Sequence, residues 1–180
     1  MIRLYSFEPF YFNNNGDQGN LDVVKNQLEK QNIKFKIVAS PADADFVLIG
    51  DCSEAVLNHY EKQLTKLRKL IAIRYEKGLP TLLVGSAYTF FAPNLGISQE
   101  PTKRESKFVT TPDGYFGYRN SDNNLPICTV KGAFIASSLF GPLLAKNPQL
   151  LGVVLEKLGA KIVLPAQVTS LIETIRSQFG

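Results

Sequence analysis

The sequence contains no tryptophan, a single histidine and only two cysteines among its 180 residues. Cys52 and Cys128 have no CxxC spacing, and His59 forms no familiar metal-ligand pattern with either of them. The sequence therefore predicts no metal site, and we expect no other cofactor. With so few cysteines a disulfide framework is not indicated, so we expect reduced thiols and a cytoplasmic location.

The sequence also lacks a long hydrophobic run. No window approaches the about 18 uninterrupted apolar residues of a membrane span, and Met1–Tyr5 leads directly into a strand pattern rather than a signal peptide. The net charge is only +4, and the most basic stretch, Lys62–Lys77, also contains Glu76. Such mixed charge is typical of the solvated face of a helix, so we expect neither nucleic-acid binding nor a membrane span.

The length and an apolar fraction of 44% fit one domain over residues 1–180. In the first half, strand patterns at 2–7, 34–39, 46–49 and 81–84 alternate with helical patterns at 21–31, 54–76 and 87–91. This order predicts an α/β fold, Rossmann-like or flavodoxin-like, with a largely parallel sheet flanked by helices. Ligands of such sheets bind beyond the carboxyl ends of the strands, which places loops 8–20, 50–54 and 85–87 at the candidate site.

The second half has a weaker pattern. Residues 100–107 are charged, and we expect them to be exposed. Short β-like pieces separated by turn residues predict strands and hairpins at 108–111, 115–118, 127–130 and 133–138. Helical patterns at 149–158 and 166–179 complete the chain.

A crowded corner follows the strand pattern Thr81–Val84. Gly85, Ser86 and Ala87 have almost no side chain, as a sharp strand-to-helix turn requires. In hydrolases and amidotransferases this corner lifts a nucleophile to the carboxyl end of the sheet. The hydrolase pattern Gly-x-Ser-x-Gly is not met, because Val84 and Tyr88 stand where it requires glycine.

Three separated stretches together resemble the class I glutamine amidotransferases of the cobyric-acid-synthase type. They are Gly16–Asn20 before a helix, the corner Leu82–Tyr88, and Gly141–Pro148 with the sequence GPLLAKNP. Within that family, the chain most resembles the amidotransferase subunit of lipid II isoglutaminyl synthase. The third stretch is the most specific because eight consecutive residues of that kind are improbable by chance, whereas 93–136 matches poorly. The resemblance implies the fold predicted above.

The resemblance also implies release of ammonia from glutamine, in which a cysteine thiolate attacks the amide, a histidine activates the thiol and corner amides hold the oxyanion. Here the cysteine position falls on Gly85 and the histidine position on Phe140. Neither residue can perform that chemistry. The resemblance therefore implies a pseudoenzyme that partners a Mur-ligase-like or other synthetase of a cell-wall or cobalamin pathway, with a glutamine-like small molecule as ligand.

An alternative is an active amidohydrolase or amidotransferase that uses Ser86 or Cys52 in the same cleft. A packing role for Ser86, a bystander thiol at Cys52 and a surface position for His59 on its helix are the simpler interpretations.

Further residues are predicted to line the ligand cleft. Gly50 and Asp51 end the third strand pattern, and Tyr88 occupies the family's tyrosine position. Arg119 lies in the region of the family's glutamine-carboxylate clamp, but a surface arginine is the favoured interpretation. Asp17 and Asn20 either cap a helix beside an anion-facing turn or only hold the loop.

Overall fold

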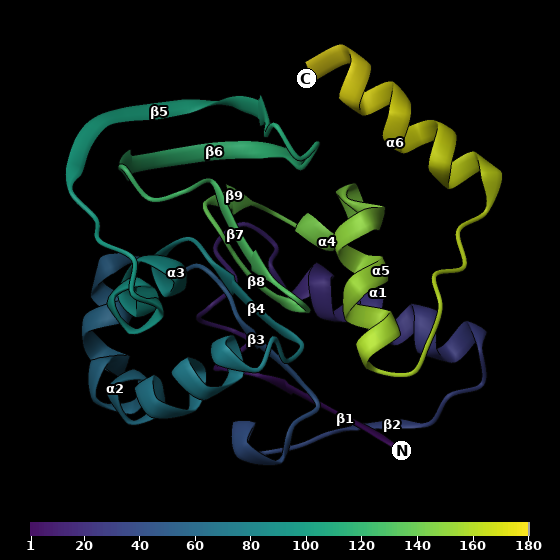
Figure 1. The fold of residues 1–180 in the computed structure, drawn as a ribbon, viewed down its shortest axis with the longest axis horizontal. Coiled ribbons are helices and arrows are strands. Elements are labelled where there is room, and N and C mark those ends of the chain that lie inside the picture. The colour runs from purple at the N-terminus through teal and green to yellow at the C-terminus, as the bar shows by residue number, and fades with distance from the viewer. Residues whose placement is uncertain (180) are drawn as a thin grey trace.

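Two β-sheets form the framework of residues 1–179, which a computed structural model describes (Figure 1). The larger sheet has the order β2-β1-β3-β4-β8-β7, and the smaller one has the order β5-β6-β9. The strands are β1 (Ile2–Ser6), β2 (Phe35–Ile37), β3 (Phe46–Ile49), β4 (Thr81–Val84), β5 (Pro101–Thr110), β6 (Phe116–Asn123), β7 (Cys128–Lys131), β8 (Phe134–Ser137) and β9 (Leu139–Phe140). The helices are α1 (Gln18–Lys30), α2 (Glu54–Glu76), α3 (Ser86–Phe91), α4 (Leu143–Lys146), α5 (Pro148–Lys157) and α6 (Ala166–Phe179), with 3₁₀ turns at Pro41–Asp43 and Ala92–Leu95.

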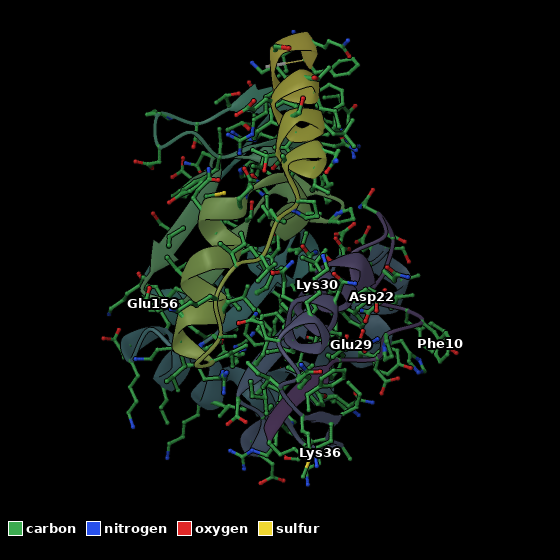
Figure 2. The ribbon with its side chains drawn as sticks, turned by 90° about the vertical axis from the view of Figure 1, so that its right-hand side faces the viewer. Phe10, Asp22, Glu29, Lys30, Lys36 and Glu156 are labelled. Atoms are coloured by element: carbon green, nitrogen blue, oxygen red, sulfur yellow. The ribbon has the colours of Figure 1, made fainter. Side chains whose placement is uncertain are left out.

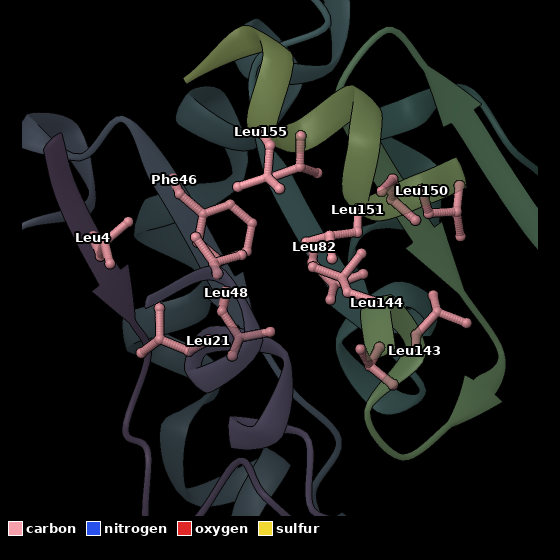
Figure 3. Packing of buried hydrophobic residues seen from close by; sticks show 14 of the residues in the cluster. Leu4, Leu21, Phe46, Leu48, Leu82, Leu143, Leu144, Leu150, Leu151 and Leu155 are labelled. Carbon is pink, nitrogen blue, oxygen red and sulfur yellow. The ribbon is translucent and has the colours of Figure 1, made fainter. Parts of the chain in front are cut away.

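The larger sheet is parallel except for β7, which pairs antiparallel with β8 at one edge. Both faces are covered, and side chains of β3 alternate between the two cores. Phe46 and Leu48 pack under α1, α4 and α5 (Figure 3), whereas Val47 and Ile49 pack against α2 and α3. Burial on both faces favours a continuous apolar strand. The predicted α/β fold with a largely parallel sheet flanked by helices is confirmed.

The hairpin β5–β6 is the main departure from the predicted elements. Most of the charged stretch 100–107 and of the predicted strand 108–111 forms one strand, β5, which pairs with β6 without interruption from Glu105 opposite Ser121 to Thr110 opposite Phe116. Most side chains of β5 are exposed. Strand patterns in sequence depend on one apolar face, so a hairpin with little burial leaves a weak pattern.

The helix α2 was predicted with its observed bounds, but its basic face is smaller than expected. Arg74 is buried, with only 4% of its surface exposed, and its guanidinium donates hydrogen bonds to Thr81 Oγ1 and to the carbonyls of Ala44, Asp45 and Pro80. Arg74 therefore ties the end of α2 to the neighbouring strands. No helix in the described part of the chain combines the length and the apolar character needed to cross a membrane.

Candidate functional site

A cavity of about 570 Å³ lies at the carboxyl ends of β3 and β4, beneath the hairpin β5–β6. Its volume is typical of a small-molecule site. The cavity is lined by Asn14, Asn15, Asp51, Cys52, Ser53, Glu54, Leu57, Gly85, Ser86, Thr89, Arg104, Asn120, Ser121, Asp122, Asn123, Ser138 and Phe140. The predicted loops 8–20, 50–54 and 85–87 therefore meet, and the hairpin adds a fourth wall.

Gly85 forms the corner between β4 and α3, with φ 55° and ψ −116°. A side chain is strained in this region of backbone space, which glycine reaches at little cost. Space is also missing: a Cβ at position 85 would lie 2.7 Å from Cε1 of Phe140 and closer still to the Asp51 carboxylate. A side chain at position 85 would therefore be strained, and the Phe140 ring and the Asp51 carboxylate would have to move to make room for it.

Asp51 fills the corner from the end of β3. The corner amide is the backbone N–H of Ser86, and it donates a hydrogen bond of 2.8 Å to Asp51 Oδ1. Asp51 Oδ2 accepts from the Asn15 side-chain amide at 3.0 Å and from that of Asn14 at 3.4 Å. The backbone N–H of Ser86 is therefore already hydrogen-bonded to Asp51 and is not free to donate to an oxyanion.

Asp17 lies behind Asp51 and is fully buried. Its Oδ2 accepts the Asp51 backbone N–H at 2.9 Å, while its Oδ1 has no hydrogen-bond partner within residues 1–179. Burial raises the pKa of Asp17 to about 7, and the charge of Asp51 adds to this, whereas hydrogen bonds from the backbone and the charge of Lys146 oppose it. Asp17 thus links loop 8–20 to loop 50–54, and its carboxyl group has a raised pKa.

Cys52 and Ser86 contact each other in the cavity. The Ser86 hydroxyl accepts the Cys52 backbone N–H at 2.9 Å and donates to the Cys52 sulfur at 3.4 Å. Burial raises the pKa of the Cys52 thiol and Asp51 raises it further, against the opposing effect of Ser86. The one histidine, His59, is exposed on α2 and packs against Tyr60 outside the cavity. Neither candidate nucleophile has an imidazole base beside it.

Phe140 also packs against the corner at Gly85. Its ring contacts the place where a Gly85 side chain would stand, and its carbonyl accepts a hydrogen bond from Lys146 Nζ at 2.8 Å. Burial lowers the pKa of Lys146, although the Asp17 charge counteracts this. The position that the resemblance assigns to histidine is therefore an apolar wall.

Several residues predicted for the cleft lie outside its lining. Asp17 and Asn20 are buried behind it, and Asn20 links α1 to α4 by accepting the Leu144 N–H at 2.8 Å. Gly50 packs directly against the backbone of Phe12. Tyr88 is fully buried, with its hydroxyl 2.7 Å from Thr129 Oγ1. All four positions hold the loops and the corner in place.

Arg119 lines a neighbouring groove on the hairpin rather than the cavity. Its guanidinium pairs with Glu105 at 3.2 Å and donates to the Asn123 carbonyl at 3.1 Å. The hairpin residues Arg104 and Asn120–Asn123 were not predicted for the site. Their polar side chains gave no indication in the sequence that they would lie near the strand ends. They line the cavity only because the hairpin β5–β6 lies over it.

No protein-family model matches this sequence, and no curated protein matches it. Among solved structures, the fold is similar to the crystal structure of a glutamine amidotransferase from Thermotoga maritima, with a TM-score of 0.50 and 15% identity over 96% of this chain and 90% of that chain. A putative GMP synthase component from Thermoplasma acidophilum is similar with a TM-score of 0.48 and 16% identity over 77% of this chain and 83% of that chain. The first likeness shows that the chain has a glutamine amidotransferase-like α/β fold.

Proposed function

We propose that this chain is a glutamine amidotransferase-like protein of the cobyric-acid-synthase type that no longer hydrolyses glutamine. In this proposal it acts as a binding or regulatory partner of a Mur-ligase-like or other synthetase, and its cleft retains the capacity to bind a glutamine-like small molecule. The partner and the pathway rest on the resemblance of the three sequence motifs, above all GPLLAKNP at Gly141–Pro148.

One observation is the main support for the proposed loss of glutaminase activity. The Asp51 carboxylate accepts a hydrogen bond from the backbone N–H of Ser86, and the Phe140 ring packs against Gly85. A tetrahedral oxyanion forming here would meet a carboxylate instead of a free N–H donor, and like charges repel strongly at such distances. The positions that the resemblance assigns to the nucleophile and the base thus hold neither group, and the Ser86 N–H is already bonded to a carboxylate.

A glutaminase assay tests this proposal. We expect the purified chain, alone or with a candidate synthetase, to release no more ammonia from glutamine than a buffer control. The matched variants are Cys52→Ala and Ser86→Ala, which remove the two remaining candidate nucleophiles in the cavity. Robust ammonia release that survives both substitutions would mean that the site has been assigned to the wrong residues.

The partner is tested separately by size-exclusion chromatography with each Mur-ligase-like or related synthetase of the same genome. A stable complex supports the regulatory role. If no such synthetase binds, this part of the proposal is wrong, whatever the glutaminase assay shows.

The contact between Ser86 and Cys52 favours a second candidate function. An active amidohydrolase or amidotransferase would use one of these residues in the same cavity, where the hydroxyl and the sulfur lie 3.4 Å apart. Incubation with an electrophilic glutamine analogue, followed by peptide mass mapping, separates the two candidates. A stoichiometric adduct on Cys52 or Ser86 supports the enzyme, and its absence supports the non-catalytic protein.

A further inference from the structure

The turn that follows β1 presents Phe10 to solvent, with 93% of its surface exposed. The Glu8 carbonyl closes this turn by accepting the N–H groups of Tyr11 and Phe12 at 2.9 Å. Glu8 itself has φ 38°, which costs free energy for a residue other than glycine. Phe12 anchors the turn, because it is fully buried and its ring lies edge-on to that of Phe7 at 4.9 Å. The turn therefore holds Phe10 in a fixed position that points away from the core.

Phe10 belongs to a small exposed aromatic patch. Tyr11, next to it in the chain, is 54% exposed, and its ring lies 5.7 Å from that of Tyr60 on α2. Glu8 adds a charge at the base of the patch, since it is exposed and forms no ion pair within residues 1–179. Exposed aromatic residues on a rigid turn are favoured in protein interfaces, because they bury a large area at a small loss of conformational entropy.

An apolar pocket of about 340 Å³ lies between α1, α4, α5 and the start of α6. Its walls include Val23, Leu144, Leu151 and Val168. An apolar cavity of about 150 Å³ is sufficient to hold benzene, so this pocket has room for a phenylalanine ring. Lys30 also lines the pocket, and it is exposed and forms no ion pair with any described residue.

The segment 161–165, which leads to α6, forms one wall of the pocket and is held against α1 by two glutamines. Gln27 Nε2 donates to the Val163 carbonyl at 3.1 Å, and Gln27 Oε1 accepts the Val163 N–H at 2.6 Å. Gln31 makes the same pair of hydrogen bonds with Lys161, at 2.6 Å and 2.9 Å. The pocket is therefore formed before anything enters it, as is usual for binding sites.

We propose that two copies of this chain form a twofold-symmetric dimer in which Phe10 of each copy enters the apolar pocket of the other. The chain carries both complementary shapes, and their unpaired charges are opposite, with Glu8 beside Phe10 and Lys30 on the pocket. A twofold interface requires both features on one side of the molecule. Phe10 projects at the edge of the face on which Asp22 and Lys30 lie (Figure 2). Each dimer thus gains two phenyl contacts and two ion pairs.

This inference goes beyond the proposed function and does not rest on it. Neither Phe10 nor any residue that lines the apolar pocket lines the cavity at Gly85. The experiments below use the purified full chain without a synthetase. Their failure therefore leaves the glutaminase assay and the synthetase-binding assay unaffected.

Sedimentation equilibrium from about 1 μM to about 1 mM tests for the dimer, for which we expect a dissociation constant at or below about 100 μM. Mixing isotope-labelled with unlabelled chains then shows whether the Phe10 ring contacts the Val168 methyl groups of the other copy. A chain that stays monomeric, or a dimer without this contact, would overturn the proposal. So would a monomer whose pocket signals respond only to added benzyl alcohol, since that would assign the pocket to a small ligand.

The variant Phe10→Ala removes both phenyl contacts from the dimer. We expect the dissociation constant to rise by roughly 100-fold, about tenfold for each ring that is no longer buried. The control Phe179→Ala removes another exposed ring that lies outside the pocket, and should change the dissociation constant by less than about threefold. Equal effects of the two variants would contradict the placement of Phe10 in the pocket.

Charge reversal tests the predicted pairing of Glu8 with Lys30. Each of Glu8→Lys and Lys30→Glu brings like charges together at both contacts, and should weaken the dimer by roughly tenfold or more. The double variant Glu8→Lys/Lys30→Glu should recover most of the affinity. An equimolar mixture of the two single variants should also dimerise, because both contacts of the mixed dimer then join opposite charges. If neither the double variant nor the mixture recovers affinity, the proposed geometry of the dimer is wrong.

Discussion

At the scale of single residues, two carboxyl groups on neighbouring loops have different environments. Asp51 is partly open to the cavity and has donors on both oxygens. Asp17 is fully buried, and one of its oxygens has no partner among the described residues. The difference follows from position: Asp51 faces a polar cavity, whereas Asp17 lies behind it, where the charged form is poorly solvated. The ionised form of Asp17 therefore lowers the free energy of unfolding, by an amount that depends on pH.

The sign of that dependence follows from the pKa of Asp17, which is about 7 in the folded state and 3.8 for the free side chain. Between these values the folded state holds its proton more tightly, so the free energy of unfolding falls as pH rises from about 4 to 7 and stays low above. We expect Asp17→Asn to flatten this slope and to stabilise the protein at pH 8 by roughly 1–3 kcal/mol, because the amide keeps the acceptor for Asp51 N–H without the charge.

Urea unfolding between pH 4 and pH 8 checks this expectation. Asp17→Ala is the control, since it removes the charge and also the acceptor for Asp51 N–H, and should gain less than the asparagine variant. Parallel stability curves for the wild-type protein and Asp17→Asn would contradict the assignment of this pH dependence to Asp17.

At the scale of elements, the segment between β9 and α5 joins the two sheets. Asn147, at the junction of α4 and α5, is fully buried. Its Nδ2 donates to the carbonyls of Phe116 and Leu143 at 2.9 Å, and its Oδ1 accepts the Phe116 N–H at 2.7 Å. One side chain therefore fixes the base of the hairpin β5–β6 to the helical layer. This explains structurally why the motif Gly141–Pro148 contains an asparagine at this position.

We expect Asn147→Ala to lower the free energy of unfolding by about 3–4 kcal/mol, because it leaves a buried donor and two acceptors of the backbone unpaired. Denaturant unfolding measures the change. The control Asn26→Ala replaces an exposed asparagine of α1 and should change stability by less than about 0.5 kcal/mol. A loss below about 1 kcal/mol for Asn147→Ala would show that the backbone groups find other partners.

At the scale of the whole molecule, the helix α6 stands apart from the two cores (Figures 1 and 2). None of its described side chains is buried. Arg176 donates to the Lys146 carbonyl at 3.0 Å and to Asn147 Oδ1 at 2.9 Å, and the ring of Phe179 lies 5.1 Å from that of Phe108. Such sparse contacts bury little apolar area, so α6 gains little stability from the rest of the molecule.

Native-state hydrogen exchange tests this difference. We expect amides of α6 to exchange through local opening, at a free energy several kcal/mol below that of β3 and β4, which are buried on both faces. The helix α2, which packs on the sheet through Leu64 and Ile71, is the internal control and should exchange with the core. Equal protection of α6 and the central strands would contradict the expectation.

Local pattern was sufficient for the elements that bury an apolar face. The strands Phe46–Ile49 and Thr81–Val84 and the helix Glu54–Glu76 have the predicted bounds, because each carries its own apolar run or helical period. The bounds of strand β5 were not predicted, because its side chains are mostly exposed and form no apolar pattern. Similarly, the loops at the carboxyl ends of the strands were predicted to lie together, and they line one cavity, but the wall formed by the hairpin was not predicted.

The sequence by itself determined what the corner lacks, since glycine at position 85 has no nucleophile and phenylalanine at position 140 has no proton to exchange. Only the tertiary structure decided what fills the space. The Asp51 carboxylate reaches the Ser86 amide from 35 residues away along the chain. Asp17 is desolvated for the same reason. Hydrogen bonds and burial between distant residues depend on how loops and sheets pack, and no local pattern encodes that packing.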